Sequence, residues 1–170
     1  INEYQNYHET KAHTSAEFPY NTYLCSIPLD FPGVPLHWHD ELELVVIKRG
    51  QGFVSVDFDK RLVHSGDIII IPPGCLHAIE QDDTFKMEYE NIIFKPDLLS
   101  SGANDLCMIQ YIVPLLDGSL PIEYFLTPAL GSFEALSNCI RQIDLVCADQ
   151  TPGWQLAVKS SLFNFFFLLI

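Results

Sequence analysis

Short hydrophobic runs separated by turn-forming residues occupy the chain from Tyr23 to about Phe94. The runs are rich in Val, Ile, Phe and Tyr and include residues 42–47, 53–58, 68–71 and 87–94. Between them, Gly, Asp and Ser gather at residues 50–52, 59–60, 65–67 and 82–83. β-Branched and aromatic residues favour strands, whereas Gly, Asp and Ser favour tight turns. The pattern therefore predicts an antiparallel β-sandwich or β-barrel, with the run at 68–71 buried on both faces.

A helical period replaces this pattern in residues 132–170. Apolar residues recur there at alternating spacings of three and four residues, which places them on one face of a helix. We expect Ser132 to cap a first helix, and Thr151 with Pro152 to begin a second after a break at residues 148–150. Two helices so closely joined should pack as an antiparallel hairpin. Their apolar stripes are Phe133, Leu136, Ile140, Ile143 and Cys147, then Trp154, Val158, Leu162, Phe165 and Leu169.

Together these patterns divide the 170 residues into four segments. Residues 1–20 are a polar N-terminal arm, 21–96 the β-barrel, 97–131 an irregular connection and 132–170 the helical hairpin. The longest apolar run, residues 165–170, is far shorter than the roughly 20 residues that cross a bilayer, so no membrane partner is expected. Because the chain starts on Ile and stops inside an apolar run, we expect it to be a fragment of a longer protein.

The net charge and the cysteines indicate which partners and which cell compartment to expect. With 9 basic and 22 acidic residues, the net charge of -13 opposes a polyanion, so these residues are not expected to bind DNA themselves. The 5 cysteines form no Cys-x-x-Cys pair, which favours buried free thiols in a reducing cytoplasm.

Candidate chemistry lies in two glycine-bracketed motifs within the predicted strands. They read Gly33-x3-His37-x-His39-x3-Glu43-x6-Gly50 and Gly66-x5-Pro72-x-Gly74-x2-His77. His37, His39 and Glu43 share a strand parity, and the turn at Pro72 should bring His77 back towards them. Burying these groups without a metal would leave polar atoms unpaired at about 1 to 3 kcal/mol each, so we favour a site for Zn, Ni, Mn or Fe. The alternative is that the same groups bind a small molecule through hydrogen bonds alone.

Glu41 has the parity of Glu43, so unless the strand is bulged we expect it to face inward, where it contacts either a ligand beside His37, His39 and His77 or a metal-binding side chain. The alternative is a solvated residue at the rim of the barrel. Trp38 has the opposite parity and should pack on the outer face. His64, His8 and His13 are not expected to be ligands, because the first lies in a turn and the others lie in the polar arm.

The paired motifs resemble those of the cupin superfamily, which implies a jelly-roll-like antiparallel barrel. Two positions depart from that pattern: Gly33 is closer to His37 than usual, and Gln81 stands where Asn is common. The order of arm, barrel and helical hairpin further resembles the N-terminal effector-binding and dimerisation domain of AraC-type transcription regulators. That resemblance implies a small-molecule effector, a homodimer and DNA binding by a C-terminal domain outside this chain. The dimer contacts expected from the helices are Phe133, Leu136, Ile140, Ile143, Val158 and Leu162. At least one of the two stripes is expected to pack against the barrel of the same chain instead, which leaves one stripe to be shared.

Two other functions remain open from the sequence. A free-standing metal-dependent cupin enzyme, an isomerase or a dioxygenase, would use the same four ligands to hold a catalytic ion. A sugar-binding module without a regulatory role would need only the barrel. We favour the sensor, because residues with acid–base chemistry are scarce beyond Glu41 and an enzyme has no need of the terminal hairpin. The acidic charge mildly favours a neutral effector such as a sugar.

Overall fold

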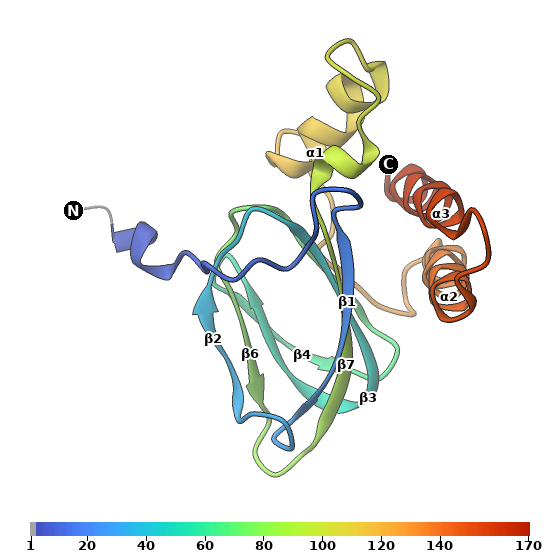
Figure 1. The fold of residues 1–170 in the computed structure, drawn as a ribbon. Coiled ribbons are helices and arrows are strands. Elements are labelled where there is room, and N and C mark those ends of the chain that lie inside the picture. The colour runs from blue at the N-terminus through green and yellow to red at the C-terminus, as the bar shows by residue number, and fades with distance from the viewer. Residues whose placement is uncertain (1–2) are drawn as a thin grey trace. The chain divides into compact units, whose positions relative to one another are not determined.

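The structure is a computed structural model and describes residues 3–170 (Figure 1). Its internal contacts define a β unit that extends to Pro96 and includes Tyr124–Leu126, and a helical unit formed by Asp97–Glu123 and Thr127–Ile170. The strands are β1 (Tyr20–Ile27), β2 (Gly33–His37), β3 (Leu42–Val56), β4 (Asp59–His64), β5 (Ile68–Ile71), β6 (His77–Gln81), β7 (Met87–Phe94) and β8 (Phe125–Leu126).

Antiparallel pairing joins all of these strands into a barrel around a shared long strand. One run of neighbours is β1-β7-β3-β5-β8, and a second connects β2 to β6, β6 to β3 and β3 to β4. The first half of β3 pairs with β5 and β7, whereas its second half pairs with β4 and β6. Because β3 belongs to both sheets, it connects the two walls of the barrel. The predicted antiparallel barrel is confirmed.

The bend in β3 explains why the sequence suggested two strands there. Pairing with β7 is irregular between Ile47 and Arg49, and Gly50 follows with a φ of 78°. A Cβ atom at Gly50 would lie 1.9 Å from the Lys86 carbonyl oxygen, so only glycine fits this position. Gly50–Gly52 is thus a bend in one strand, not the predicted turn.

The turn expected at residues 59–60 lies two positions earlier. Val56 pairs with Asp59, and the two residues between them, Asp57 and Phe58, have φ values of 47° and 70°. Positive φ at both loop positions gives a hairpin turn whose twist matches that of the flanking strands. A phenylalanine at such a position is unusual, which is why the sequence pattern placed the turn on Asp59.

A cluster of buried apolar side chains forms the core of the barrel. Each residue of β5 is at most 1% exposed, so this strand is buried on both faces as predicted. Val45 and Val54 from β3 and Ile79 from β6 belong to the same cluster as Ile69 and Ile71 of β5. Burial of each such side chain contributes about 1.5 to 3 kcal/mol of stability. This cluster is therefore the main source of stability for the barrel that carries the motif residues.

The N-terminal segment lies on the barrel in a defined register. A 3-10 turn, η1 (Glu3–Tyr7), leads to an isolated parallel bridge between His8 and Trp38. The Tyr4 and His8 rings stack on the Trp38 ring at centroid distances of 4.6 and 4.1 Å. These contacts bury Trp38 on the side opposite its two neighbouring histidines, which agrees with its expected outward parity.

The helical unit contains more regular structure than the sequence suggested. Residues 97–131, expected to be irregular, include a π-helical turn η3 (Met108–Ile112) and α1 (Val113–Leu116), and they also contribute β8 to the other unit. A 3-10 turn, η2 (Pro96–Leu99), precedes η3 and α1 in the chain. Such short elements have too few residues to show a period.

Two long helices, α2 (Phe133–Asp149) and α3 (Trp154–Leu169), confirm the predicted C-terminal pair. Ser132 occupies the N-cap position of α2 as expected, although its side chain makes no capping bond, whereas the cap expected at Thr151 is wrong because Gly153 precedes α3. Gly153 has a φ of 89°, a conformation that glycine adopts without strain. Among residues 3–170, no helix has the length and apolarity to cross a membrane.

Candidate metal and ligand site in the barrel

Three histidines and a glutamate from separate elements meet inside the barrel. His37 ends β2 and pairs in register with His77, the first residue of β6. The Pro72–Gly74 turn precedes β6, and the Gly74 amide donates to the His39 carbonyl at 2.8 Å. Residues 38–41 separate β2 from β3, so the single strand expected to carry His37, His39 and Glu43 is interrupted. Tertiary pairing, rather than strand parity alone, brings these side chains together.

Backbone carbonyls orient all three imidazole rings in the same way. His37 Nδ1 lies 2.9 Å from the Pro35 oxygen, His39 Nδ1 3.1 Å from the Glu41 oxygen, and His77 Nδ1 2.9 Å from the Cys75 oxygen. A carbonyl oxygen can only accept, so each Nδ1 carries the proton. With Nδ1 protonated, a neutral ring has the lone pair of Nε2 available for a metal; without a cation, His39 Nε2 instead donates to the Glu43 carboxylate at 3.0 Å.

The free nitrogens and one carboxylate converge on a common point. Ligand atoms of His37, His39 and His77 all lie within 4.8 Å of one another. Glu43 Oε2 lies 3.0 Å from His39 Nε2 and 3.2 Å from His77 Nε2. The second contact lacks the direction of a hydrogen bond, so the buried His77 Nε2 has no hydrogen-bond partner among residues 3–170.

These distances fit a first-row divalent metal. Metal–ligand bonds of about 2.0 to 2.2 Å place neighbouring ligand atoms roughly 3 to 3.5 Å apart, which is the separation of Glu43 from both nitrogens. The unpaired nitrogen of His77 is a second sign of fit, because a cation would satisfy it. The imidazole and carboxylate donors suit Zn, Ni, Mn or Fe.

Electrostatics keep Glu43 ionised. Burial by itself raises the pKa of this carboxyl, but contacts with His39 and His77 outweigh that effect and hold the pKa well below its ordinary value. Burial lowers the pKa of His39 as well, yet the Glu43 hydrogen bond and charge leave it raised. For His37, burial and the neighbouring His77 lower the pKa, which favours the neutral, metal-binding form.

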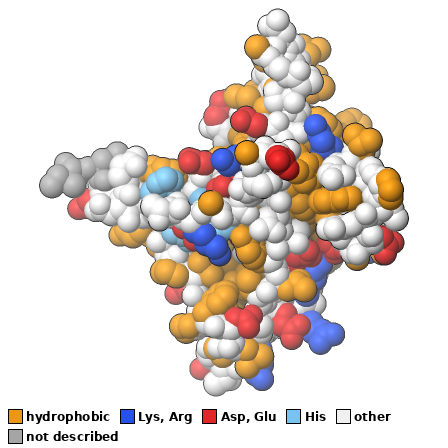
Figure 2. Space-filling model, viewed as in Figure 1, with side chains coloured by type: hydrophobic (Ala, Val, Ile, Leu, Met, Phe, Trp, Pro, Cys, Tyr) orange, Lys and Arg blue, Asp and Glu red, His pale blue; other side chains and the backbone are white. Residues whose placement is uncertain are grey.

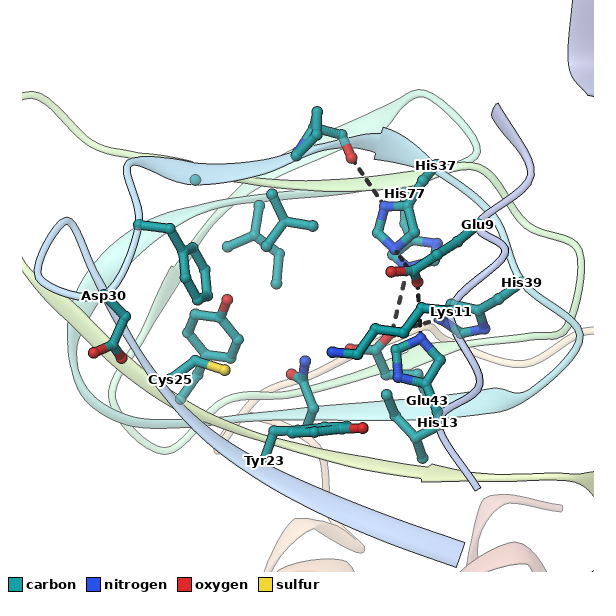
Figure 3. Close-up of a pocket in the computed structure, with 18 of the residues that line it drawn as sticks. Glu9, Lys11, His13, Tyr23, Cys25, Asp30, His37, His39, Glu43 and His77 are labelled. Atoms are coloured by element: carbon teal, nitrogen blue, oxygen red, sulfur yellow. Dashed lines mark hydrogen bonds and ion pairs between the residues drawn. The ribbon is translucent and has the colours of Figure 1, made fainter. Parts of the chain in front are cut away.

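A cavity of about 530 Å³ opens from this cluster (Figure 3). The histidines and Glu43 lie at one end, Lys11 reaches towards the middle, and Asp30 and Cys25 lie at the other end. Its lining includes four buried polar atoms that have no hydrogen-bond partner in the described part of the chain: His13 Nδ1, His77 Nε2, the Tyr89 hydroxyl and Asn91 Oδ1. Apolar side chains complete the walls, among them Phe31, Val34, Ile79 and Ile93.

Sequence reasoning missed three residues of this site. Glu9, Lys11 and His13 from the N-terminal segment line the cavity, and His13 is only 8% exposed. Burial raises the pKa of Glu9, but the hydrogen bond from His13 leaves it lowered overall. Their alternation at positions 9, 11 and 13 was a usable signal, because such spacing places side chains on one side of an extended chain.

Glu41 has a different position from the one expected. It is buried, but it does not line the cavity, because residues 38–41 are not part of a strand that would turn its side chain inward. Its carboxylate lies 3.7 Å from His39 Nδ1, on the ring edge that faces away from Glu43. Glu41 therefore orients the His39 ring through contacts with Nδ1, on the ring edge opposite Glu43. His64 is exposed, as expected for a turn residue.

The fold and this cluster match a known family of ligand-binding domains. Residues 32–166 match the model of the AraC-like ligand binding domain. The chain belongs to this family. An antiparallel barrel followed by two C-terminal helices is the fold that the resemblance implied.

Relatives of this AraC-like domain include transcription regulators. The chain is 33% identical over 159 residues to the uncharacterized HTH-type transcriptional regulator YdeC of Bacillus subtilis, covering 93% of this chain and 54% of YdeC. It is 32% identical over 69 residues to the HTH-type transcriptional activator RhaR of Mannheimia succiniciproducens, covering 41% of this chain and 24% of that protein. The chain thus spans about half or less of these relatives.

Solved structures similar to the AraC-like domain include a cupin protein from Bacteroides fragilis. The two chains are 24% identical, with a TM-score of 0.44, covering 52% of this chain and 80% of that one.

Proposed function

We propose that this AraC-like domain is the effector-sensing part of a transcription regulator and binds a small molecule in the barrel cavity. One observation carries the proposal: a single cavity is lined by four buried polar atoms that have no hydrogen-bond partner among residues 3–170, and by three histidines whose Nδ1 atoms all contact backbone carbonyls. An unpaired buried polar atom costs about 1 to 3 kcal/mol, which a ligand with matching groups would recover. The cavity also has a volume within the usual range for small-molecule sites, about 300 to 1,000 Å³.

The proposed site includes a divalent transition metal bound by His37, His39, Glu43 and His77. Bound there, a cation would offer open coordination positions to the hydroxyl or carbonyl oxygens of an effector. The carbonyl contacts of the three Nδ1 atoms support this assignment, because they hold each ring in the orientation that ligation requires.

A neutral, hydroxyl-rich molecule such as a sugar is the proposed effector. The lining offers carboxylates at Glu9 and Asp30, an ammonium at Lys11 and an amide at Asn91, which can donate to and accept from hydroxyl groups. The strongly acidic chain disfavours a multiply charged anion.

Calorimetric titration with a panel of aldopentoses and aldohexoses tests this function. We expect at least one sugar to bind, and Asn91→Leu to weaken that binding about tenfold or more because the lost hydrogen bond is buried. Asn138→Leu, an exposed change on α2, is the matched control and should have no effect. Equal binding of every panel member by Asn91→Leu and the native chain would contradict the cavity as the binding site.

We also propose that the regulator is a homodimer and binds DNA through another part of the protein. Five of the six expected dimer contacts, all except Phe133, are buried within this single chain. They are therefore not available to a second copy. Leu156, Phe163 and Phe167 instead form an exposed apolar face on α3, being 75%, 37% and 74% exposed, and we assign the dimer contact to this face.

A binding role is proposed in preference to the metal-dependent enzyme. The names of the relatives support it, since they are transcription regulators. A cytoplasmic location is proposed from the five free cysteines, because such thiols persist in a reducing compartment.

A further inference from the structure

The N-terminal segment is fixed to the residue that separates two of the proposed metal ligands. The Trp38 amide donates to the Tyr7 carbonyl, and the Glu9 amide donates to the Trp38 carbonyl, both at 2.9 Å. This is the parallel bridge that aligns His8 with Trp38. The backbone from 7 to 9 therefore runs beside the His37-Trp38-His39 segment in a set register.

That register determines where the side chain of Glu9 points. Paired residues in neighbouring extended segments share a side, and the His8 ring accordingly stacks on the Trp38 ring. Alternation then places Glu9 on the opposite side, where His37 and His39 lie. Glu9 Oε2 lies 3.6 Å from His37 Nε2, and Figure 3 shows the Glu9 carboxylate beside the histidine cluster.

A second side chain of the same segment holds this carboxylate in place. His13 Nε2 lies 2.8 Å from Glu9 Oε2, and the His13 ring packs edge-on against His39 with a centroid distance of 5.5 Å. Asn21 in turn donates to the His13 carbonyl at 2.9 Å. A carboxylate held by a histidine in this way is oriented as metal-ligating carboxylates commonly are.

We propose that Glu9 is an additional ligand for the cation at His37, His39, Glu43 and His77, and that cation binding fastens residues 7–13 over the cavity. This proposal rests on the metal site proposed above. With Glu9 and Glu43 both negative, a divalent cation between them would convert a repulsive pair of carboxylates into two attractive contacts. Figure 2 shows histidine side chains at the surface where the N-terminal segment lies.

The simpler alternative is that Glu9 and His13 form an ordinary ion pair unrelated to the cluster. The register of the His8–Trp38 bridge argues against this alternative, because the bridge directs Glu9 towards His37 independently of His13. The two readings differ in a measurable way: only a ligand role makes the order of residues 7–13 depend on the cation.

Lys11 provides a natural reporter, since trypsin cleaves after lysine and this residue lies between Glu9 and His13. The probe is Ni²⁺ alone, added to metal-free protein, with cleavage after Lys11 and after Lys86 followed by mass spectrometry. Lys86 is exposed in the β6–β7 turn, far along the chain from the segment, and corrects for any effect of Ni²⁺ on trypsin. We expect Ni²⁺ to slow cleavage after Lys11 at least fivefold relative to Lys86, where fivefold is an order-of-magnitude estimate from the stability gained on ligand binding.

Glu9→Gln, which removes the charge but keeps the shape, should abolish that protection. It should also weaken Ni²⁺ binding about tenfold in a calorimetric titration. Glu17→Gln is the matched control, because it removes the same charge from an exposed position of the same segment. It should retain the protection and the affinity of the native chain.

Unchanged Ni²⁺ affinity and unchanged protection in Glu9→Gln would overturn the role of Glu9 and leave the metal site intact. If instead the native chain binds no Ni²⁺, the metal site itself fails and the role of Glu9 fails with it. Ni²⁺ binding without protection of Lys11 in the native chain also overturns the proposal. Circular dichroism of both variants must match the native chain, so that a loss of fold is not mistaken for a loss of ligation.

Discussion

The barrel cavity and the exposed face of α3 depart from ordinary packing in opposite ways. The cavity lining contains polar atoms that are buried and unpaired, including His77 Nε2 and Asn91 Oδ1. The α3 face presents large apolar side chains to solvent, and Phe167 is 74% exposed. Buried polar groups and exposed apolar groups are the informative exceptions to the packing of globular proteins. The first kind matches a small polar ligand or a cation, and the second matches another protein surface.

We infer from this difference that the two units bind different partners. Both share well-packed apolar interiors, with Ile69 in the barrel and Leu162 in the helical unit fully buried. The two units differ in their exceptions to this packing, which are buried polar atoms in the barrel cavity and exposed apolar side chains on α3. Changes in the shared interiors should therefore cost stability, whereas changes in the two exceptional regions should cost binding of different partners.

Leu162→Ala should have the largest effect and should affect folding alone. The side chain is fully buried, so its truncation is expected to lower the free energy of unfolding by about 2 to 5 kcal/mol. Leu156→Ala, on the exposed face of the same helix, should change it by less than about 0.5 kcal/mol at a dilution where the chain is monomeric. Urea denaturation measures both. Similar losses for the two variants would show that the α3 face is not exposed in the monomer.

His77→Ala should remove the cation function of the cavity. We expect the affinity for Ni²⁺ to fall by more than about 100-fold, since even residues behind the ligands commonly contribute 10- to 100-fold. His64→Ala, an exposed histidine in the same unit, should leave the affinity unchanged. Calorimetric titration makes the comparison, and equal losses in both variants would point to unspecific surface binding.

Phe167→Glu should weaken self-association without changing cation binding. A charge placed in an apolar contact between two copies is expected to raise the dimer dissociation constant at least about tenfold. Sedimentation velocity over a range of concentrations measures this constant. Gln155→Glu is the control, because it adds the same charge at an exposed position of α3 outside the row formed by Leu156, Phe163 and Phe167. A dimer that persists unchanged in Phe167→Glu would place the contact elsewhere.

The sequence predicted the barrel and the site better than it predicted the helix contacts. Strand composition and the two glycine-bracketed motifs indicate a barrel because they reflect local turn chemistry, as Gly50 and Gly74 show by their positive φ values. The approach of Glu9 and His13 depends on a bridge to Trp38, a long-range contact that leaves no local period. Likewise, the stripe through Ile140 and Leu162 shows that one face of each helix is buried, but a stripe does not reveal whether its partner is the same chain or a second copy.

The central claim is that the three oriented histidines form one cation site at the end of the effector cavity. Long-range ¹H–¹⁵N correlation spectra of the histidine side chains test it directly, with and without Zn²⁺. The account predicts that His37, His39 and His77 carry their proton on Nδ1, and that Zn²⁺ shifts the Nε2 resonance of these three while His64 is unaffected. Nε2 atoms of these rings that stay protonated in the presence of Zn²⁺, or Zn²⁺-induced shifts at His64 and not at the cluster, would contradict it.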